Sequence, residues 1–201
     1  MELYRNASPR GRGISGVEIT YRNLPHWHKD FCIQFITFHL ADSLPAAVRK
    51  EINNRRLSFL KDNPQPWSDA TKAEYNKLFS SLTNKYLDAG YGSCCLSKRE
   101  CAHIMEQCLK HFDGERYRLH RYVVMANHVH VLVEMIGKYT ISEVCKSWKN
   151  FSALNINRLL GRSGKLWHPE SWDRMIRDER HYNSVVAYIE KNIRQGGILW
   201  Q

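Results

Sequence analysis

A run of valines interrupted by two histidines, Val123–Met135 (VVMANHVHVLVEM), constrains the fold of this chain more than any other segment. Successive side chains of an extended strand point to opposite faces, so His128 and His130 are expected on one face and the valines on the other. Leu132 and Glu134 share the histidine face. If the valine face is buried, the two imidazoles lie close together on the opposite surface, where they suit chelation of one divalent cation. Taken alone, the pattern also fits a surface strand that carries two histidines.

The segments around this run predict an α+β sandwich, one antiparallel sheet with packed helices. A strand at 117–125 is expected to pair with the histidine strand in a hairpin, with Ala126-Asn127 as the tight turn. Further strands are expected at 31–40 and, as a short edge strand, at 172–176. The expected helices cover residues 45–61, 71–87, 97–114, 140–160 and a segment that starts after Asp178.

Two of these helices begin with an expected capping box, Ser97 with Glu100 and Thr140 with Glu143. In the second of them, six residues fall roughly on one side and are expected to face the core: Ile141, Val144, Trp148, Phe151, Asn155 and Leu159.

The C-terminal helix carries the second chemical signal, in DERHYNSVVAYIEKNIRQ at 178–195. Asp178 is the expected N-cap, and the apolar residues recur at helical spacing with Tyr182 at the middle of the stripe. Tyr188 and Asn192 lie at the margin of that stripe, four residues apart, so one stacks a turn above the other. A phenol and an amide there could serve as nucleophile and metal ligand, or could simply be half-buried polar neighbours.

These segments together resemble the single-tyrosine HUH transposases, and most closely their REP-associated branch, which is linked to repeated extragenic palindromes. The likeness spans most of the chain and is much more specific than an isolated H-x-H. The segments that carry it are ITFHLADSLP at 36–45, YLDAGYGSCCL at 86–96, RYRLHRYVVMANHVHVLVE at 116–134, SWKNFSALNINRLL at 147–160 and LWHPESWDRMIRDERHYNSVVAYIEKN at 166–192.

The resemblance implies a ferredoxin-like fold and a metal-dependent nuclease that acts on single-stranded DNA bearing hairpins. In the family, two histidines and a glutamine or asparagine four residues after the tyrosine hold Mg²⁺ or Mn²⁺, and the tyrosine attacks a phosphodiester. By motif, these roles fall on His128, His130, Asn192 and Tyr188. Glu134, on the histidine face, is a possible additional member of the metal shell. The expected product is a 5′-phosphotyrosine with a free 3′-OH, which permits strand transfer.

The charge of the chain agrees with a nucleic-acid partner. Its 201 residues include 30 Lys and Arg against 20 Asp and Glu, a formal net charge of +10, and a basic chain favours polyanions. No apolar segment suggests a membrane span or a signal peptide, so a cytoplasmic, DNA-associated protein is expected. The candidate DNA contacts are Lys146, Lys149, Arg116, Arg118, Arg121, Arg174 and Arg177.

Length favours a single catalytic domain at 21–201, preceded by a basic, glycine-rich arm at 1–20. Both a monomer and a homodimer remain open. The six cysteines form no C-x-x-C pair, so they are expected to be reduced and mostly buried, without a zinc site. The leading interpretation is a DNA nickase and strand transferase; the alternative is a DNA-binding protein that retains this fold without the chemistry.

Overall fold

The predicted hairpin is present in the main sheet of the computed structural model, and its second strand is the central strand of that sheet. Its strands β4 (Tyr117–Val124) and β5 (His128–Met135) pair antiparallel, and the N–H of Met125 donates to the carbonyl of His128 across the turn. Alternation along β5 separates two cores, with the three valines in the larger core and Leu132 in the smaller one. The period of two therefore assigned the faces of this strand correctly.

The structure describes residues 18–21, 25–28 and 32–201. The main sheet is antiparallel throughout, in the order β6-β3-β5-β4-β7. Its remaining strands are β3 (Ile33–His39), β6 (Trp172–Met175) and β7 (Leu199–Trp200). A separate two-stranded sheet pairs β1 (Glu18–Tyr21) with β2 (Pro25–His28). Most of the predicted arm lies outside the described residues, and residues 18–20 belong to β1.

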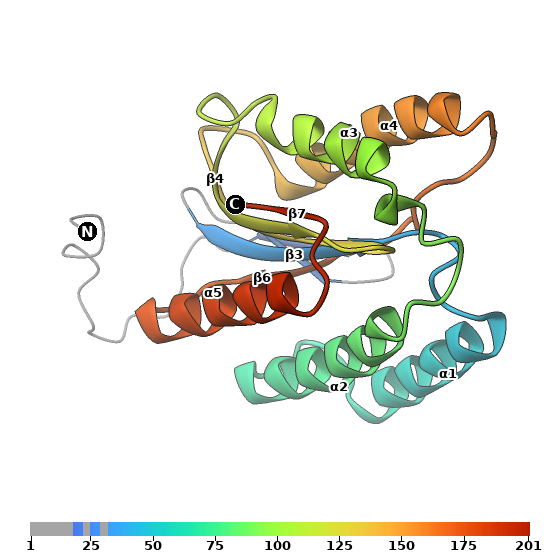
Figure 1. Ribbon diagram of the computed structural model, residues 1–201. Coiled ribbons are helices and arrows are strands. Elements are labelled where there is room, and N and C mark those ends of the chain that lie inside the picture. Colours follow the sequence, from blue (N-terminus) through green and yellow to red (C-terminus); the bar gives the residue numbers. More distant parts are fainter. Residues whose placement is uncertain (1–17, 22–24, 29–31) are drawn as a thin grey trace.

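Helices cover both faces of the main sheet, with α3 and α4 on one side and α5, α2 and α1 on the other (Figure 1). Their bounds are Ala46–Asp62 (α1), Asp69–Asp88 (α2), Arg99–Lys110 (α3), Ile141–Leu159 (α4) and Glu179–Arg194 (α5), and a 3₁₀ turn at Cys95–Ser97 (η1) precedes α3. Among the described helices, none is long and apolar enough to cross a membrane.

The order of strands and helices defines a ferredoxin-like fold. The elements β3, α3, β4, β5, α4 and β6 follow the βαββαβ pattern, with β3 and β5 in the middle and β6 and β4 flanking them. Two features are added to this pattern: β7 extends the sheet beyond β4, and the helical hairpin α1–α2 is inserted between β3 and α3. The predicted α+β sandwich is confirmed.

Three of the six residues of α4 that were predicted to face the core do not do so in the structure. Ile141, Val144 and Trp148 are buried as expected, but the side chain of Phe151 is 61% exposed and that of Leu159 is 50% exposed. Asn155 is half-buried and its amide donates to the carbonyl of Phe151. The residues that face the core on those turns are instead Cys145, Ser152 and Ile156.

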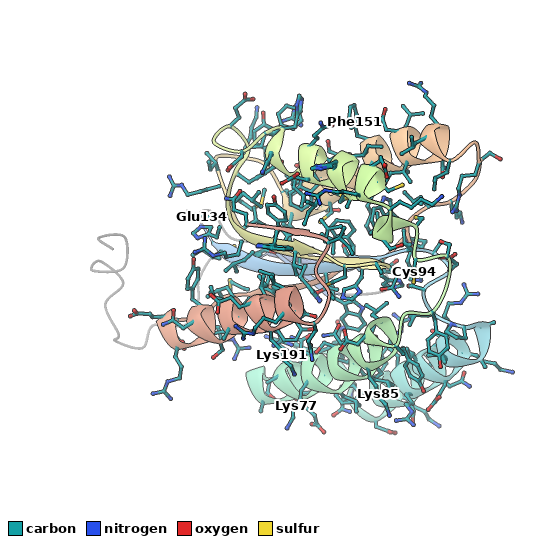
Figure 2. All side chains as sticks on the ribbon, viewed as in Figure 1. Lys77, Lys85, Cys94, Glu134, Phe151 and Lys191 are labelled. Atoms are coloured by element: carbon teal, nitrogen blue, oxygen red, sulfur yellow. The ribbon has the colours of Figure 1, made fainter. Side chains whose placement is uncertain are left out.

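Ser152 explains the difference, because its hydroxyl is buried and finds hydrogen-bond partners within the core. Its hydroxyl donates to the carbonyl of Trp148 at 2.6 Å and accepts from the indole N–H of Trp167 at 2.8 Å. A hydrophobic pattern cannot anticipate a buried serine that is held by two hydrogen bonds. Phe151 instead points outward from α4 (Figure 2) and stacks on His111.

The two predicted capping boxes have opposite outcomes. Thr140 caps α4, since its hydroxyl accepts from the N–H of Glu143 and the Glu143 carboxylate accepts from the N–H of Thr140. The box predicted at Ser97 is wrong: Ser97 ends the 3₁₀ turn η1, and α3 begins after Lys98 without a side-chain cap. The residue between η1 and α3, Lys98, has an extended backbone and takes the N-cap position instead of Ser97.

We therefore expect Thr140→Ala to lower the free energy of unfolding by about 1 kcal/mol, because it leaves N-terminal N–H groups of α4 without a partner. Ser97→Ala should change it by less than about 0.5 kcal/mol, as at an ordinary exposed position. Urea denaturation of the two variants against the parent measures both values. Equal losses in the two variants would contradict the assignment of the caps.

Candidate active site

The imidazoles of the two histidines of β5 lie against one another at the end of the strand where β4 turns into β5. The Nε2 atoms of His128 and His130 lie 3.1 Å apart, and the two rings are close to perpendicular. Their side chains are 1% and 0% exposed, so the expected surface position is wrong. Phe35 from β3 stacks on the ring of His130, and α5 supplies Tyr188 beside it. The face opposite the valines is a second buried layer.

Hydrogen bonds determine which nitrogen each imidazole presents. The Nδ1 of His128 lies 2.7 Å from Oδ1 of Asn127. The Asn127 amide donates from Nδ2 to the carbonyls of Leu87 and Tyr91, so its oxygen must face the histidine. An amide oxygen only accepts, so Nδ1 of His128 carries the proton and Nε2 presents a lone pair.

The second imidazole has an adaptable partner. The Nδ1 of His130 lies 2.7 Å from the hydroxyl of Thr37 on β3, and a hydroxyl can either donate or accept. When Thr37 accepts, His130 also presents a bare Nε2. A hydrogen-bonded second nitrogen is the usual arrangement for metal-binding histidines, because it fixes the ring and its tautomer.

Burial keeps both imidazoles neutral. It lowers the pKa of His128 to about 4 and the pKa of His130 well below its ordinary value, with the neighbouring His128 as a further cause for His130. Neutral imidazole is the form that binds metal. Two bare Nε2 atoms 3.1 Å apart repel one another unless a cation or a proton lies between them, and that separation suits two ligands of one ion. The pair therefore fits a divalent cation.

A third protein ligand would have to be a residue other than His, Cys, Asp or Glu. Within the described part of the chain, no group of three or more His, Cys, Asp or Glu side chains is placed to hold a metal. Asn192 on α5 is 2% exposed, and its Nδ2 donates to the backbone carbonyl of Tyr188 at 2.9 Å. Its Oδ1 is the atom left to coordinate, and an amide oxygen suits a hard cation.

Helix α5 carries Tyr188 to the histidines, as the phase of its apolar stripe predicts. Its Oη lies 3.5 Å from Nε2 of His130 and accepts from the amide of Asn84 on α2 at 3.0 Å. Burial, followed by the negative charge of Asp88, raises the pKa of the Tyr188 phenol to about 12, while the Asn192 amide and the Arg174 guanidinium lower it. Ionising this phenol therefore requires additional positive charge nearby.

Tyr182 lies six residues earlier on α5; it is half-buried and packs against the smaller core, the side of the helix on which it was predicted. Its hydroxyl is 3.1 Å from Nδ1 of His120. The helix thus separates its two tyrosines, with one at the core and one at the histidine pair.

Glu134 does not belong to the site. It lies at the other end of β5, four residues from His130, which is roughly 13 Å along a strand. Its carboxylate accepts from the guanidinium of Arg118 at 3.1 Å and lies 3.5 Å from Nε2 of His120. Sharing a face of a strand is not sufficient for sharing a metal, because each step of two residues adds about 7 Å.

The predicted cationic contacts fall into separate places. Arg174 and Arg177 line a cavity of about 920 Å³ that reaches Tyr188. Arg116 stacks on the ring of Phe112. Arg118 lies on β4 towards the far end of the hairpin, and Arg121 lies in the middle of that strand.

Lys146 and Lys149 line a second hollow, of about 390 Å³, beside α4. The ammonium of Lys149 donates to the backbone carbonyls of His168, Pro169 and Glu170. These bonds use all three of its N–H groups, so the structure favours a role for Lys149 in holding that loop rather than in contacting DNA. Lys146 is exposed.

Several residues at the site carry no signal that the sequence patterns reveal. Asn127 directly precedes the histidines, but the pattern identifies it only as a turn residue, whereas its amide orients His128. Thr37 and Asn84 come from segments far away in sequence, and α2 lines the cavity with Lys77 and Lys85. Only the tertiary structure brings these residues to the tyrosine.

Residues 95–192 match the family described as Transposase IS200 like. This segment, about half of the chain, contains both histidines, Tyr188 and Asn192, and it belongs to that family of DNA transposases. Two similar solved structures share 14% sequence identity over 86% of this chain. One is a REP-associated tyrosine transposase bound to a REP hairpin, 71% of which is covered, with a TM-score of 0.40. The other is a putative transposase from Deinococcus radiodurans R1, 95% of which is covered, with a TM-score of 0.33. Among curated proteins, none matches the chain significantly.

The buried imidazoles predict loss of stability in mild acid. Burial lowers the pKa of His39, which lies beside His128 in the sheet, to about 3, and that of His128 to about 4. Unfolded histidine binds a proton near pH 6.5, so below that pH the unfolded state holds more protons than the folded one. The stabilisation is complete above about pH 6.5 and is lost as the pH falls towards 4, by on the order of 1 kcal/mol per pH unit for each imidazole.

Denaturation curves between pH 7 and pH 4.5 measure that slope. His39→Gln should make it shallower, because it removes one of the buried imidazoles. If this variant has the same slope as the parent, buried neutral histidines do not cause the acid sensitivity.

Proposed function

We propose that the chain nicks single-stranded DNA in a divalent-metal-dependent reaction and transfers the cut strand through a 5′-phosphotyrosine on Tyr188. The observation that supports this most directly is the convergence of the nucleophile and the histidine pair: Oη of Tyr188 lies 3.5 Å from Nε2 of His130, which faces Nε2 of His128 at 3.1 Å. These groups lie close together within one chain, an arrangement that is compatible with action in cis.

The three residues proposed to hold the cation are His128, His130 and Asn192. Two nitrogen ligands make Mn²⁺ at least as suitable as Mg²⁺, which prefers oxygen. These residues would hold the cation beside the phosphodiester, where it would supply Lewis-acid chemistry and offset the developing negative charge.

Tyr188 supplies the covalent step. Its oxygen bonds to phosphorus as the bond from phosphorus to the 3′ oxygen breaks; the phenol loses its proton, and the leaving 3′ oxygen takes one up to become a free 3′-OH. Attack by a 3′-OH on the phosphotyrosine reverses these changes, rejoins DNA and restores the phenol. Arg174 assists by favouring the ionised phenol, since its positive charge lowers the pKa of Tyr188.

The proposed substrate is unpaired DNA that carries a hairpin, of the kind found in repeated extragenic palindromes. The hairpin preference rests on the sequence motifs that resemble the REP-associated branch. The unpaired strand is supported by the site itself, because a phosphodiester has to enter a cavity that is closed on one side by α2 and on the other by α5. Arg174 and Arg177 in that cavity suit phosphate.

A trapping experiment tests the proposal. The protein is incubated with labelled single-stranded hairpin DNA and Mn²⁺, and a protein–DNA adduct that survives denaturation is sought. The parent and Tyr182→Phe should form it, and Tyr188→Phe should form none, because the lost hydroxyl is the attacking atom. Mass spectrometry of the adduct should identify a peptide in which DNA is linked to Tyr188.

Other results would overturn the proposal in distinct ways. Binding of DNA without cleavage by the parent protein would indicate a DNA-binding protein that keeps the fold without the chemistry. Metal-dependent cleavage that persists in Tyr188→Phe would indicate hydrolysis without a covalent intermediate. An adduct on Tyr182 would show that the nucleophile is Tyr182, on the other side of α5, and not Tyr188.

A further inference from the structure

The helical hairpin α1–α2 lies outside the segment that matches the transposase family, yet it contacts the nucleophile. The match begins at residue 95, whereas α2 ends at Asp88. From consecutive turns of α2, Asn84 donates to Oη of Tyr188 at 3.0 Å and Ser80 accepts from the guanidinium of Arg174 at 3.2 Å. The inserted helix α2 therefore contacts both the proposed nucleophile, Tyr188, and the neighbouring guanidinium of Arg174, so it is placed to affect the reaction.

One face of α2 forms a wall of the large cavity. The α2 residues that line it recur every three or four positions, as the residues on one helical face do. They include Lys77, Ser80, Asn84 and Lys85. The opposite wall is made by β6, the segment after it and α5, including Trp172 and Tyr188.

Positive charge lines both walls of this cavity. Lys77 and Lys85 are exposed on α2, and no hydrogen bond or ion pair with a described residue engages their ammonium groups (Figure 2 labels both). Arg174 and Arg177 line the opposite wall. Burial lowers the pKa of Arg174, and the positive charge of the nearby Arg177 lowers it further. Two neighbouring guanidiniums favour an anion between or beside them.

Carboxylates also line the cavity, but two of them are engaged elsewhere. The Asp178 side chain accepts from the N–H of His181 as the N-cap of α5, and Asp173 is buried with interactions of its own. Asp88, whose pKa is raised by burial and lowered by Lys191, lies at the Tyr188 end. Four Lys and Arg side chains thus line the cavity against three carboxylates, and two of these carboxylates already have partners within the protein.

The dimensions and surface chemistry fit the backbone of a nucleic-acid strand. Eight residues separate Lys77 from Lys85, roughly 12 Å along a helix, which spans more than one phosphate of a strand. The half-buried indole of Trp172 on the opposite wall can stack on a base, the contact by which unpaired strands are held without reading their sequence.

We propose that α2 is the second wall of a strand-binding cleft, in which Lys77 and Lys85 hold phosphates of the unpaired DNA strand that leads to Tyr188, while Asn84 positions the attacking oxygen. The inference rests on the proposed function, since it assumes that Tyr188 acts on DNA. It adds a binding site and a positioning residue that the family-matched segment does not contain.

The first test removes charge from the cleft. In Lys77→Gln/Lys85→Gln, the dissociation constant for a short fluorescent single-stranded oligonucleotide, measured by anisotropy, should rise about tenfold. The slope of log affinity against log salt should become shallower by roughly 1.4, at about 0.7 for each lost phosphate contact. The matched control Lys50→Gln/Lys61→Gln loses the same charge from α1, outside the cavity, and should bind nearly as the parent does. Equal weakening in the two double variants would overturn the cleft.

The second test separates positioning from binding. Asn84→Ala should lower the single-turnover rate of adduct formation at saturating DNA at least tenfold while the dissociation constant stays within about twofold, and Asn84→Gln, which keeps an amide donor, should restore part of the rate. An unchanged rate, or a loss of binding that accounts for the whole effect, would contradict the role of Asn84.

The binding assay needs no catalysis, so it tests the cleft even if the parent forms no adduct. If the parent protein forms no adduct, only the proposed function is refuted. Circular dichroism and thermal melting of all four variants establish that they fold as the parent does.

Discussion

The hydrogen bond between Nδ1 of His128 and Oδ1 of Asn127 determines what the centre of this protein can do. The Asn127 amide is itself fixed by the carbonyls of Leu87 and Tyr91, at the end of α2 and in the turn that follows it. One side chain therefore connects the tip of the hairpin to the inserted helices, and it directs the bare Nε2 of His128 towards His130. Without this constraint the imidazole could flip or exchange its tautomer, and the Nε2 lone pairs of the two histidines would no longer point to the same place.

Burial gives the site its electrostatic character. It keeps the imidazoles neutral and, by the same desolvation, raises the pKa of the nearby Tyr188 to about 12. The two effects are complementary. Neutral histidines are ready to bind a cation, and the phenol needs positive charge before it can ionise.

Much of this arrangement could be predicted from the sequence because it depends on local periodicity. Alternation along β5 assigned the two histidines to one face, and the stripe of α5 separated Tyr188 from Tyr182. The errors arise where long-range contacts decide. Burial of the imidazoles depends on Phe35 and on α5, which lie far from β5 in sequence.

The wrong assignments for α4 and Glu134 have the same kind of cause. The inward face of α4 depends on a serine that the core satisfies through Trp167. The alternation of the strand places Glu134 on the histidine face, but Arg118 pairs with it at the far end of the strand. No local pattern reveals that Asn84, on an inserted helix, contacts the nucleophile.

The central claim is that the two imidazoles and Asn192 form one metal site beside Tyr188, and anomalous diffraction from crystals soaked in Mn²⁺ tests it most directly. The account predicts a single strong peak within bonding distance of Nε2 of His128, Nε2 of His130 and Oδ1 of Asn192. That peak should be absent from crystals of His128→Ala. A strong peak elsewhere, or none between the imidazoles at saturating Mn²⁺, would contradict the account.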